Sequence, residues 1–160
     1  MIKIRKFKRS DTFAVAKLIR DTYHKFNYLE SPKKYANWYI SMYKPTKNPN
    51  LIENFLKTPF FYVATDDNKI IGMIRGRKYK KRRNCAALTN LFVYSKYHGI
   101  KVGKALIEKF ETEVKKKKFK EIHINASIFA TPIYQHLGYK KTTGIRNMKG
   151  VNVQPLLKKI

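Results

Sequence analysis

The spacing of apolar side chains predicts that the chain begins with a strand and a helix. Residues 2–6 alternate between apolar and charged side chains, which is the two-residue period of a half-buried strand. The next segment has the period of a helix, and Ser10 or Asp11 is suited to cap its N-terminus. The expected apolar face of this helix consists of Val15, Leu18, Ile19, Tyr23 and Phe26.

A second helix is predicted from residue 31, where Ser31 is suited to the N-cap and Pro32 to the first helical position. Its stripe is largely aromatic and comprises Tyr35, Trp38, Tyr39, Met42 and Tyr43. The segment 44–50 contains two prolines and two asparagines, so it is expected to end the helix. Residues 51–57 can form one or two further helical turns.

The rest of the chain alternates between strand and helix patterns, which predicts one α/β domain over residues 1–160. Two β-rich runs within 60–79 form a hairpin through a turn at Asp66, Asp67 and Asn68. Further on we expect a basic loop at 80–84, a strand at 85–93, a helix that starts near Val102 and ends in the lysines 115–118, a strand at 121–126, a short helix at 131–137 and a closing hairpin within 138–159.

The composition is typical of a folded, water-soluble domain. The chain has 160 residues, of which 43% are hydrophobic, and this is enough to build a core. No apolar run approaches the roughly 20 residues that cross a bilayer. The start, "MIKIRKF", lacks the continuous apolar centre of a signal peptide. We therefore expect a cytoplasmic protein without a membrane partner.

Cys85 is the only cysteine, which excludes an internal disulfide and a thiolate-rich zinc site. The four histidines are not paired at metal-ligand spacing, so we expect no metal site. A small buried side chain is the expected role of Cys85.

The formal charge of +26 indicates attraction to polyanions. The 36 basic residues are 28 lysines and 8 arginines, and the lysines occur in nearly every segment. Proteins that bind nucleic acids specifically tend to concentrate arginine side chains at one interface. Lysines spread over the whole chain are equally typical of a general compositional bias.

The segment "LFVYSKYHGIKVGKALIEKF" (91–110) predicts a strand, a glycine-bearing turn and a helix. The first N–H groups of a helix have no partner within it and lie at the positive end of its dipole. Such a turn favours an anion, and a pyrophosphate fits it. An ordinary helix cap is the alternative interpretation.

The element order and two motifs resemble the GNAT superfamily of acyl-CoA-dependent N-acetyltransferases. The first motif is an apolar strand, Leu91–Val93, followed by "HGIKVG" (98–103), which is similar to the family's Gln/Arg-x-x-Gly-x-Gly/Ala loop. The second is "ATPIYQHLGY" (130–139), which is similar to Ala-x-x-apolar-Tyr-x-x-x-Gly-Phe/Tyr. The resemblance implies a mixed, mostly antiparallel twisted sheet of six or seven strands, with about four helices and with strands four and five splayed apart.

The resemblance also implies acetyl-CoA as co-substrate and assigns site residues. Leu91, Phe92 and Val93 would offer backbone groups to the pantetheine. The backbone of the loop would wrap the pyrophosphate through His98, Gly99, Ile100, Lys101, Val102, Gly103 and Lys104. Tyr134 matches the family's general acid beside the CoA sulfur, although a packed tyrosine is the simpler interpretation.

Two departures from the family pattern matter for the mechanism. Lys101 stands at the first glycine of the loop, where a positive φ would cost roughly 1 kcal/mol for a side-chain-bearing residue. The family's glutamate on the fourth strand is replaced, and the matching position is Ala87. The general base is therefore unassigned among Glu30, His24 and Glu53.

The resemblance implies a primary amine of a small molecule or a protein as the acceptor, and the sequence leaves this amine unidentified. The aromatic region 23–43 is either core or the wall of an acceptor pocket that favours an amine by cation–π contact. The alternative function is binding of RNA, or modification of an RNA-associated amine, through the basic segment 75–84. The loop 80–84 could equally be a solvated turn or contact the 3′-phosphate of CoA. The expected oligomeric state is a monomer or a homodimer.

Overall fold

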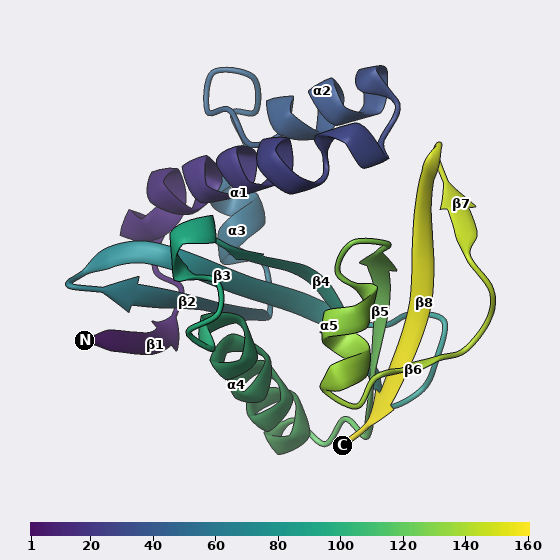
Figure 1. Cartoon of the computed structure of the whole chain (residues 1–160). Helices are drawn as coiled ribbons and strands as arrows, with labels where there is room; N and C mark the ends of the chain where they lie inside the picture. Colours follow the sequence, from purple (N-terminus) through teal and green to yellow (C-terminus); the bar gives the residue numbers. More distant parts are fainter.

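The computed structural model describes residues 1–160 and contains one eight-stranded sheet with helices on both faces (Figure 1). The strand order is β1-β2-β3-β4-β5-β8-β6, and β7 also pairs with β8. All pairs are antiparallel except β4–β5. The strands are β1 (Ile2–Lys6), β2 (Phe60–Asp66), β3 (Lys69–Lys78), β4 (Cys85–Val93), β5 (Glu121–Ser127), β6 (Lys140–Lys141), β7 (Arg146–Met148) and β8 (Val151–Lys159).

Two groups of helices cover the two faces of the sheet and enclose two cores. The helices are α1 (Thr12–Phe26), α2 (Lys33–Ser41), α3 (Leu51–Leu56), α4 (Val102–Lys116) and α5 (Thr131–His136). The first core lies between the sheet and α1–α3, and the second lies between the sheet and α4–α5. Neighbouring residues of β3 divide between them, with Met73 in the first core and Ile74 in the second. This is the alternation of a strand buried on both faces.

The mixed fold with splayed fourth and fifth strands is confirmed, and most elements lie where the sequence predicts them. The sheet has eight strands rather than the expected six or seven, because the segment that pairs with β8 is interrupted and forms two strands, β6 and β7. β6 pairs with Leu156–Leu157 and β7 with Val151–Val153. Between them, Gln154 is buried and donates a side-chain hydrogen bond of 2.7 Å to the carbonyl of Thr143. No helix is long and apolar enough to span a membrane.

The predicted face of α2 is partly wrong. Trp38 is 48% exposed, and Met42 is also exposed, whereas Ala36 is the buried residue of this helix. Only one side of α2 faces α1, and the small side chain of Ala36 makes this close contact. The aromatic stripe is therefore partly exposed to solvent. Ser31 is not the N-cap, which is Pro32, and its hydroxyl instead pairs with the Tyr23 hydroxyl at 2.8 Å.

Asp11 is the N-cap residue of α1, as expected, but its carboxylate makes no hydrogen bond to this helix. Arg5 donates two hydrogen bonds of 2.7 and 2.8 Å to it, and the Lys8 N–H donates a third of 2.9 Å. Burial opposes ionisation here, but the hydrogen bonds from Arg5 and Lys8 outweigh it, so the pKa of Asp11 is lowered. The ion pair between Arg5 and Asp11 connects β1 to the start of α1.

Cys85 begins β4 and is fully buried, as predicted. Burial raises the pKa of its thiol. A thiol in this position is protonated and shielded from solvent, which fits a packing role.

Candidate active site between the splayed strands

An irregularity in β4 separates this strand from β5. In the pairing with β3, Arg75 lies opposite Asn90 and Gly76 opposite Leu88, which leaves Thr89 as an extra residue. Such a β-bulge bends the strand that carries it. The parallel pairing with β5 ends at Leu88 and Ile124, immediately before the bulge. Beyond this point the edge of β4 toward β5 has no strand partner.

Gly76 makes this bulge feasible by its lack of a side chain. A Cβ at this position would lie 2.3 Å from the Ala87 carbonyl oxygen and 2.5 Å from the ring of Phe110. Only a glycine allows β3, β4 and α4 to approach this closely.

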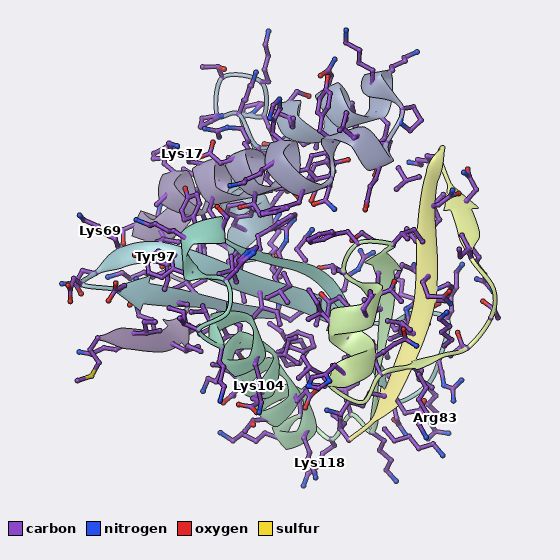
Figure 2. All side chains as sticks on the ribbon, viewed as in Figure 1. Lys17, Lys69, Arg83, Tyr97, Lys104 and Lys118 are labelled. Carbon is purple, nitrogen blue, oxygen red and sulfur yellow. The ribbon has the colours of Figure 1, made fainter.

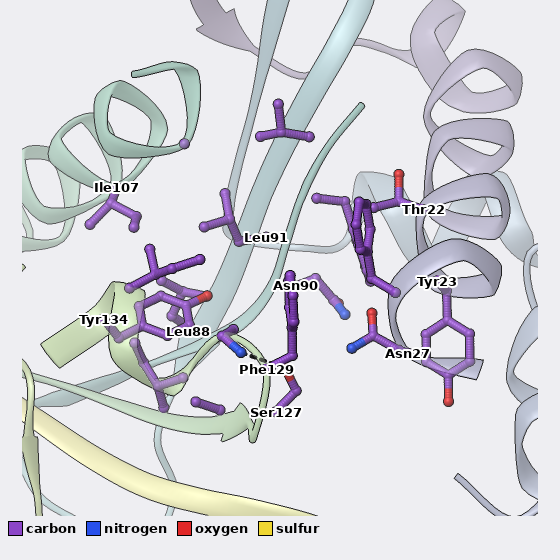
Figure 3. A pocket seen from close by; sticks show the side chains of 18 of the residues that line it. Thr22, Tyr23, Asn27, Leu88, Asn90, Leu91, Ile107, Ser127, Phe129 and Tyr134 are labelled. Atoms are coloured by element: carbon purple, nitrogen blue, oxygen red, sulfur yellow. Dashed lines mark hydrogen bonds between the residues drawn. The ribbon is translucent and has the colours of Figure 1, made fainter. Parts of the chain in front are cut away.

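A cavity of about 1000 Å³ occupies the gap between the splayed strands (Figure 3). Most of the residues that line it are hydrophobic. Figure 3 shows Ile107 and Tyr134 on one side, Thr22, Tyr23 and Asn27 of α1 on the other, and Asn90 and Phe129 between them. Large, mostly apolar clefts with a few polar groups are typical ligand sites.

The structure brings nearly all predicted site residues to this cavity. Those that line it are Leu91, Phe92, Val93, His98, Gly99, Lys101, Val102, Gly103, Lys104 and Tyr134. Ile100 is the exception, because its side chain is 55% exposed and does not line the cavity. Residues from β4, the following turn, α4 and α5 therefore meet at one cavity. The two sequence motifs lie far apart in the chain and did not themselves show this convergence.

The turn after β4 leads into α4 with an unusual backbone. Lys101 occupies the N-cap of α4 with φ 65° and ψ 14°, in the left-handed region, and Gly99 has φ 79°. The positive φ anticipated at Lys101 is thus present, and a side-chain-bearing residue adopts it at a cost of roughly 1 kcal/mol. Gly103 lies within the helix, where the nearest atom to an added Cβ would be the Val93 side chain at 4.0 Å.

The side chain of His98 connects the turn to the end of β4. One of its ring nitrogens, Nε2, lies 2.8 Å from the Val93 carbonyl oxygen and donates to it in the tautomer protonated there. The imidazole also stacks on Phe26 of α1, with ring centroids 5.2 Å apart. This side chain therefore links the β4 edge, the turn and α1.

Tyr134 lies in the single turn-and-a-half of α5 and is 6% exposed. The N-cap of α5 is Ala130 rather than Thr131, whose hydroxyl donates to the Ser127 carbonyl at 2.9 Å. Tyr134 packs edge-on against Tyr139 at 5.7 Å. Burial raises its pKa, so the hydroxyl keeps its proton at neutral pH.

Asn90 also lines the cavity, and the sequence did not single it out. Its Oδ1 accepts a hydrogen bond of 2.7 Å from Arg75, and its Nδ2 donates one of 2.9 Å to the Tyr39 hydroxyl. The side chain is fixed at both ends and, as an amide, is not a base. Ala87, the expected position of the family's glutamate, does not line the cavity.

Of the three candidate bases, the structure brings only Glu30 to the cavity. Its Oε1 accepts a hydrogen bond of 3.1 Å from the Phe129 N–H, across a sequence separation of 99 residues. Its Oε2 is buried and has no partner. His24 is exposed on α1 and packs against Tyr28, and Glu53 pairs with Arg9 at 3.7 Å on the surface.

The positive charge is spread over the molecule. Figure 2 shows Lys17 on α1, Lys69 at the start of β3 and Lys104 on α4, whereas Arg83 and Lys118 lie toward the bottom of the view. A second, more open hollow near the start of β4 is lined by Arg83, Lys115, Lys118, Lys120 and Lys159. No residue of the loop 80–84 lines the main cavity, so this loop does not complete it.

Comparison with solved structures shows that this arrangement is a known fold. The PaiA N-acetyltransferase from Thermoplasma acidophilum, solved in complex with coenzyme A, matches with a TM-score of 0.80 and 23% identity over 100% of this chain and 99% of that one. An acetyltransferase of the GNAT family from Staphylococcus aureus Mu50 has a TM-score of 0.75 and 19% identity, over 99% of each chain. The ribosomal-protein-S18-alanine N-acetyltransferase from Escherichia coli has a TM-score of 0.67 and 18% identity, over 98% of this chain and 91% of that one.

The sequence itself confirms the relationship. A family model described as the acetyltransferase (GNAT) domain matches residues 29–160. This chain belongs to the GNAT acetyltransferase family. A comparison with curated proteins finds no significant match.

Proposed function

We propose that this protein transfers an acetyl group from acetyl-CoA to a primary amine held in the same cavity. The observation that carries the proposal is the convergence of three features on one cavity: the unpartnered edge of β4, the left-handed turn before α4 and the buried Tyr134. Each suits a different part of the donor, namely the pantetheine arm, the pyrophosphate and the thioester.

The edge of β4 from Leu91 to Val93 would pair with the pantetheine as an added strand does. The turn 98–104 would receive the pyrophosphate, because the first N–H groups of α4 point out of the helix and its dipole favours an anion. The complex of PaiA with coenzyme A shows that a protein of this fold binds this ligand. That likeness supports the assignment of the cavity to acetyl-CoA.

The reaction then follows from the residues around the thioester. The neutral amine attacks the carbonyl carbon, and the oxygen gains negative charge, which a backbone N–H of β4 would stabilise by about 3 kcal/mol. The C–S bond breaks, and the leaving sulfur takes the proton of the Tyr134 hydroxyl. The Tyr134 hydroxyl is protonated at neutral pH, and the negative charge that develops on the sulfur draws this proton although burial raises the pKa of Tyr134.

Glu30 is the residue that we assign as base. An ammonium ion is not a nucleophile, so the acceptor must lose a proton before it attacks, and Glu30 supplies the only carboxylate among the residues that line the cavity. The proton passes to its carboxylate and then to solvent. The attacking nitrogen loses a second proton as the amide forms, and through solvent this proton replaces the one that Tyr134 gives to the sulfur. One proton is therefore released in each turnover, and Glu30 and Tyr134 return to their starting forms.

Thermal unfolding with added ligand tests the donor. A ligand at about 100 times its dissociation constant stabilises the folded state by about 2.7 kcal/mol. We expect acetyl-CoA to raise the Tm, whereas adenosine alone should not. An unchanged Tm at millimolar acetyl-CoA contradicts the proposed function. Release of free CoA in the presence of an amine panel then tests the transfer.

A further inference from the structure

We infer that the acceptor is a small primary amine that carries one positive charge and a flat apolar group, and that Glu30 binds its ammonium group. The inference rests on the proposed function and names the substrate class for the half of the cavity next to α1 and α2. Three observations carry it: the aromatic wall, the lone carboxylate and the unpartnered polar atoms.

Aromatic rings form the wall of this half of the cavity. Tyr23 and Tyr39 stack at 4.1 Å, and Phe26 and Phe129 stack at 5.4 Å. All four residues line the cavity, as does Tyr35. Flat faces bind a flat apolar group by stacking, and their negative quadrupoles attract a neighbouring cation.

Two buried polar atoms beside this wall lack partners within the protein. Thr22 Oγ1 and Glu30 Oε2 are the only buried side-chain nitrogen or oxygen atoms without a hydrogen bond, and both residues line the cavity. Thr22 is 7% exposed. Buried polar groups are nearly always satisfied, so the exceptions indicate groups that a ligand completes. An ammonium group donates hydrogen bonds, which a carboxylate oxygen and a hydroxyl oxygen accept.

Charge limits the acceptor to a single ammonium group. A polyamine would bring further cations, and the cavity has no second carboxylate to receive them. Lys101 and Lys104 also line the cavity and would repel them. The lone carboxylate of Glu30 therefore matches a monoamine.

The roof of this half limits the size of the acceptor. The tip of the β7–β8 hairpin meets the start of α2, where an added Cβ on Gly150 would lie 2.5 Å from Pro32. Lys149 lies over the Trp38 ring at 5.8 Å. Ser31 and Val151, next to this bridge, line the cavity. The closed side fits a small molecule better than a folded protein surface.

The test compares amines by kcat/KM with acetyl-CoA, measured as CoA release. Tyramine and phenethylamine represent the inferred class, ethylamine lacks the ring, and spermidine adds charges. We expect the two arylalkyl amines to exceed ethylamine and spermidine at least tenfold. Equal or higher values for spermidine or ethylamine overturn the inference, as does the absence of turnover with every amine when acetyl-CoA still raises the Tm. Failure of acetyl-CoA itself to bind contradicts the proposed function instead.

A pair of variants tests the role of Glu30 by binding as well as by turnover. Glu30→Gln keeps the shape of the side chain but removes its charge, so we expect tyramine affinity in the CoA complex, measured by calorimetry, to fall at least tenfold. Affinity for acetyl-CoA should not change. Glu53→Gln, outside the cavity, should leave both values unchanged. An unchanged tyramine affinity in Glu30→Gln overturns the assignment of this carboxylate.

Discussion

The side chains of Arg75 and Asn90 are joined by a hydrogen bond of 2.7 Å at the position where β4 bulges. Arg75 also lies over the rings of Tyr43, Phe55 and Phe61 at 5.2–5.8 Å. The contact links β3 to β4, and the Tyr39 hydroxyl, which accepts from Asn90, extends it to α2. A polar network therefore connects the bulged strand to the roof of the cavity.

We predict that Asn90→Ala lowers the free energy of unfolding by about 2 kcal/mol, because Arg75 and Tyr39 both lose a partner in a part-buried site. Urea unfolding measures this change. The matched variant Asn147→Ala also breaks two side-chain hydrogen bonds, to Asn152 and from the Gly150 N–H, but in an exposed turn, so it should lower the value by about 1 kcal/mol or less. Equal losses of stability in the two variants would mean that the network of Arg75, Asn90 and Tyr39 stabilises the protein no more than exposed hydrogen bonds do.

Replacement of Lys101 by glycine should relieve the left-handed backbone at the N-cap of α4. We expect Lys101→Gly to stabilise the protein by up to about 1 kcal/mol and to preserve acetyl-CoA affinity, because the turn acts through its N–H groups. Lys118→Gly is the matched control, since Lys118 has φ 66° and does not line the cavity. It should show the same stabilisation. A loss of acetyl-CoA affinity in Lys101→Gly that grows at low salt would show instead that the ammonium group contacts a phosphate.

Tyr134→Phe should lower kcat about 100-fold and leave the Kd of acetyl-CoA unchanged, because only the proton donor is removed. The neighbouring Tyr139→Phe is the control. Tyr139 does not line the cavity, and its hydroxyl donates to Glu111 at 3.0 Å, so this variant should lose roughly 1 kcal/mol of stability and keep its kcat. Steady-state kinetics and urea unfolding separate the two outcomes. An undiminished kcat in Tyr134→Phe removes this residue from the mechanism.

The ion pair between Asp11 and Arg5 predicts a loss of stability in acid. The pKa of Asp11 is lowered in the folded state, so the stabilisation is fully present above the unfolded value of about 3.9. It is lost as the pH falls through the lower, folded value. Asp11→Asn should therefore cost roughly 1–3 kcal/mol at pH 7, toward the lower end because Arg5 is partly exposed, and much less at pH 2.

Urea unfolding at both pH values measures this difference. Asp21→Asn is the control because Asp21 forms an exposed pair with Lys17, which should contribute below about 1 kcal/mol at pH 7. If Asp11→Asn lowered the free energy of unfolding equally at pH 7 and pH 2, the stabilisation would not depend on the ionisation of Asp11.

Local patterns in the sequence predicted the elements, because apolar spacing directly reflects which face of a strand or helix is buried. The two motifs placed the donor side of the cavity, from Leu91 to Lys104 and at Tyr134, but not the residues of α1 and α2 that line its other side. The bulge at Thr89 could not be predicted, since it depends on the register between β3 and β4 and on space at Gly76. The contact of Glu30 with Phe129 joins residues 99 positions apart, and no local period encodes it.

The buried position of Cys85 has a practical and a chemical consequence. The proposed reaction consumes a thioester and releases a thiol, and the disulfide that CoA forms when it is oxidised exchanges with accessible cysteine thiolates. The only thiol of this protein is fully buried and has a raised pKa, so the folded protein offers no thiolate for exchange with CoA or for attack on acetyl-CoA. A thiol-specific reagent added to the native protein during turnover therefore reports released CoA alone, and the protein resists modification by oxidised CoA.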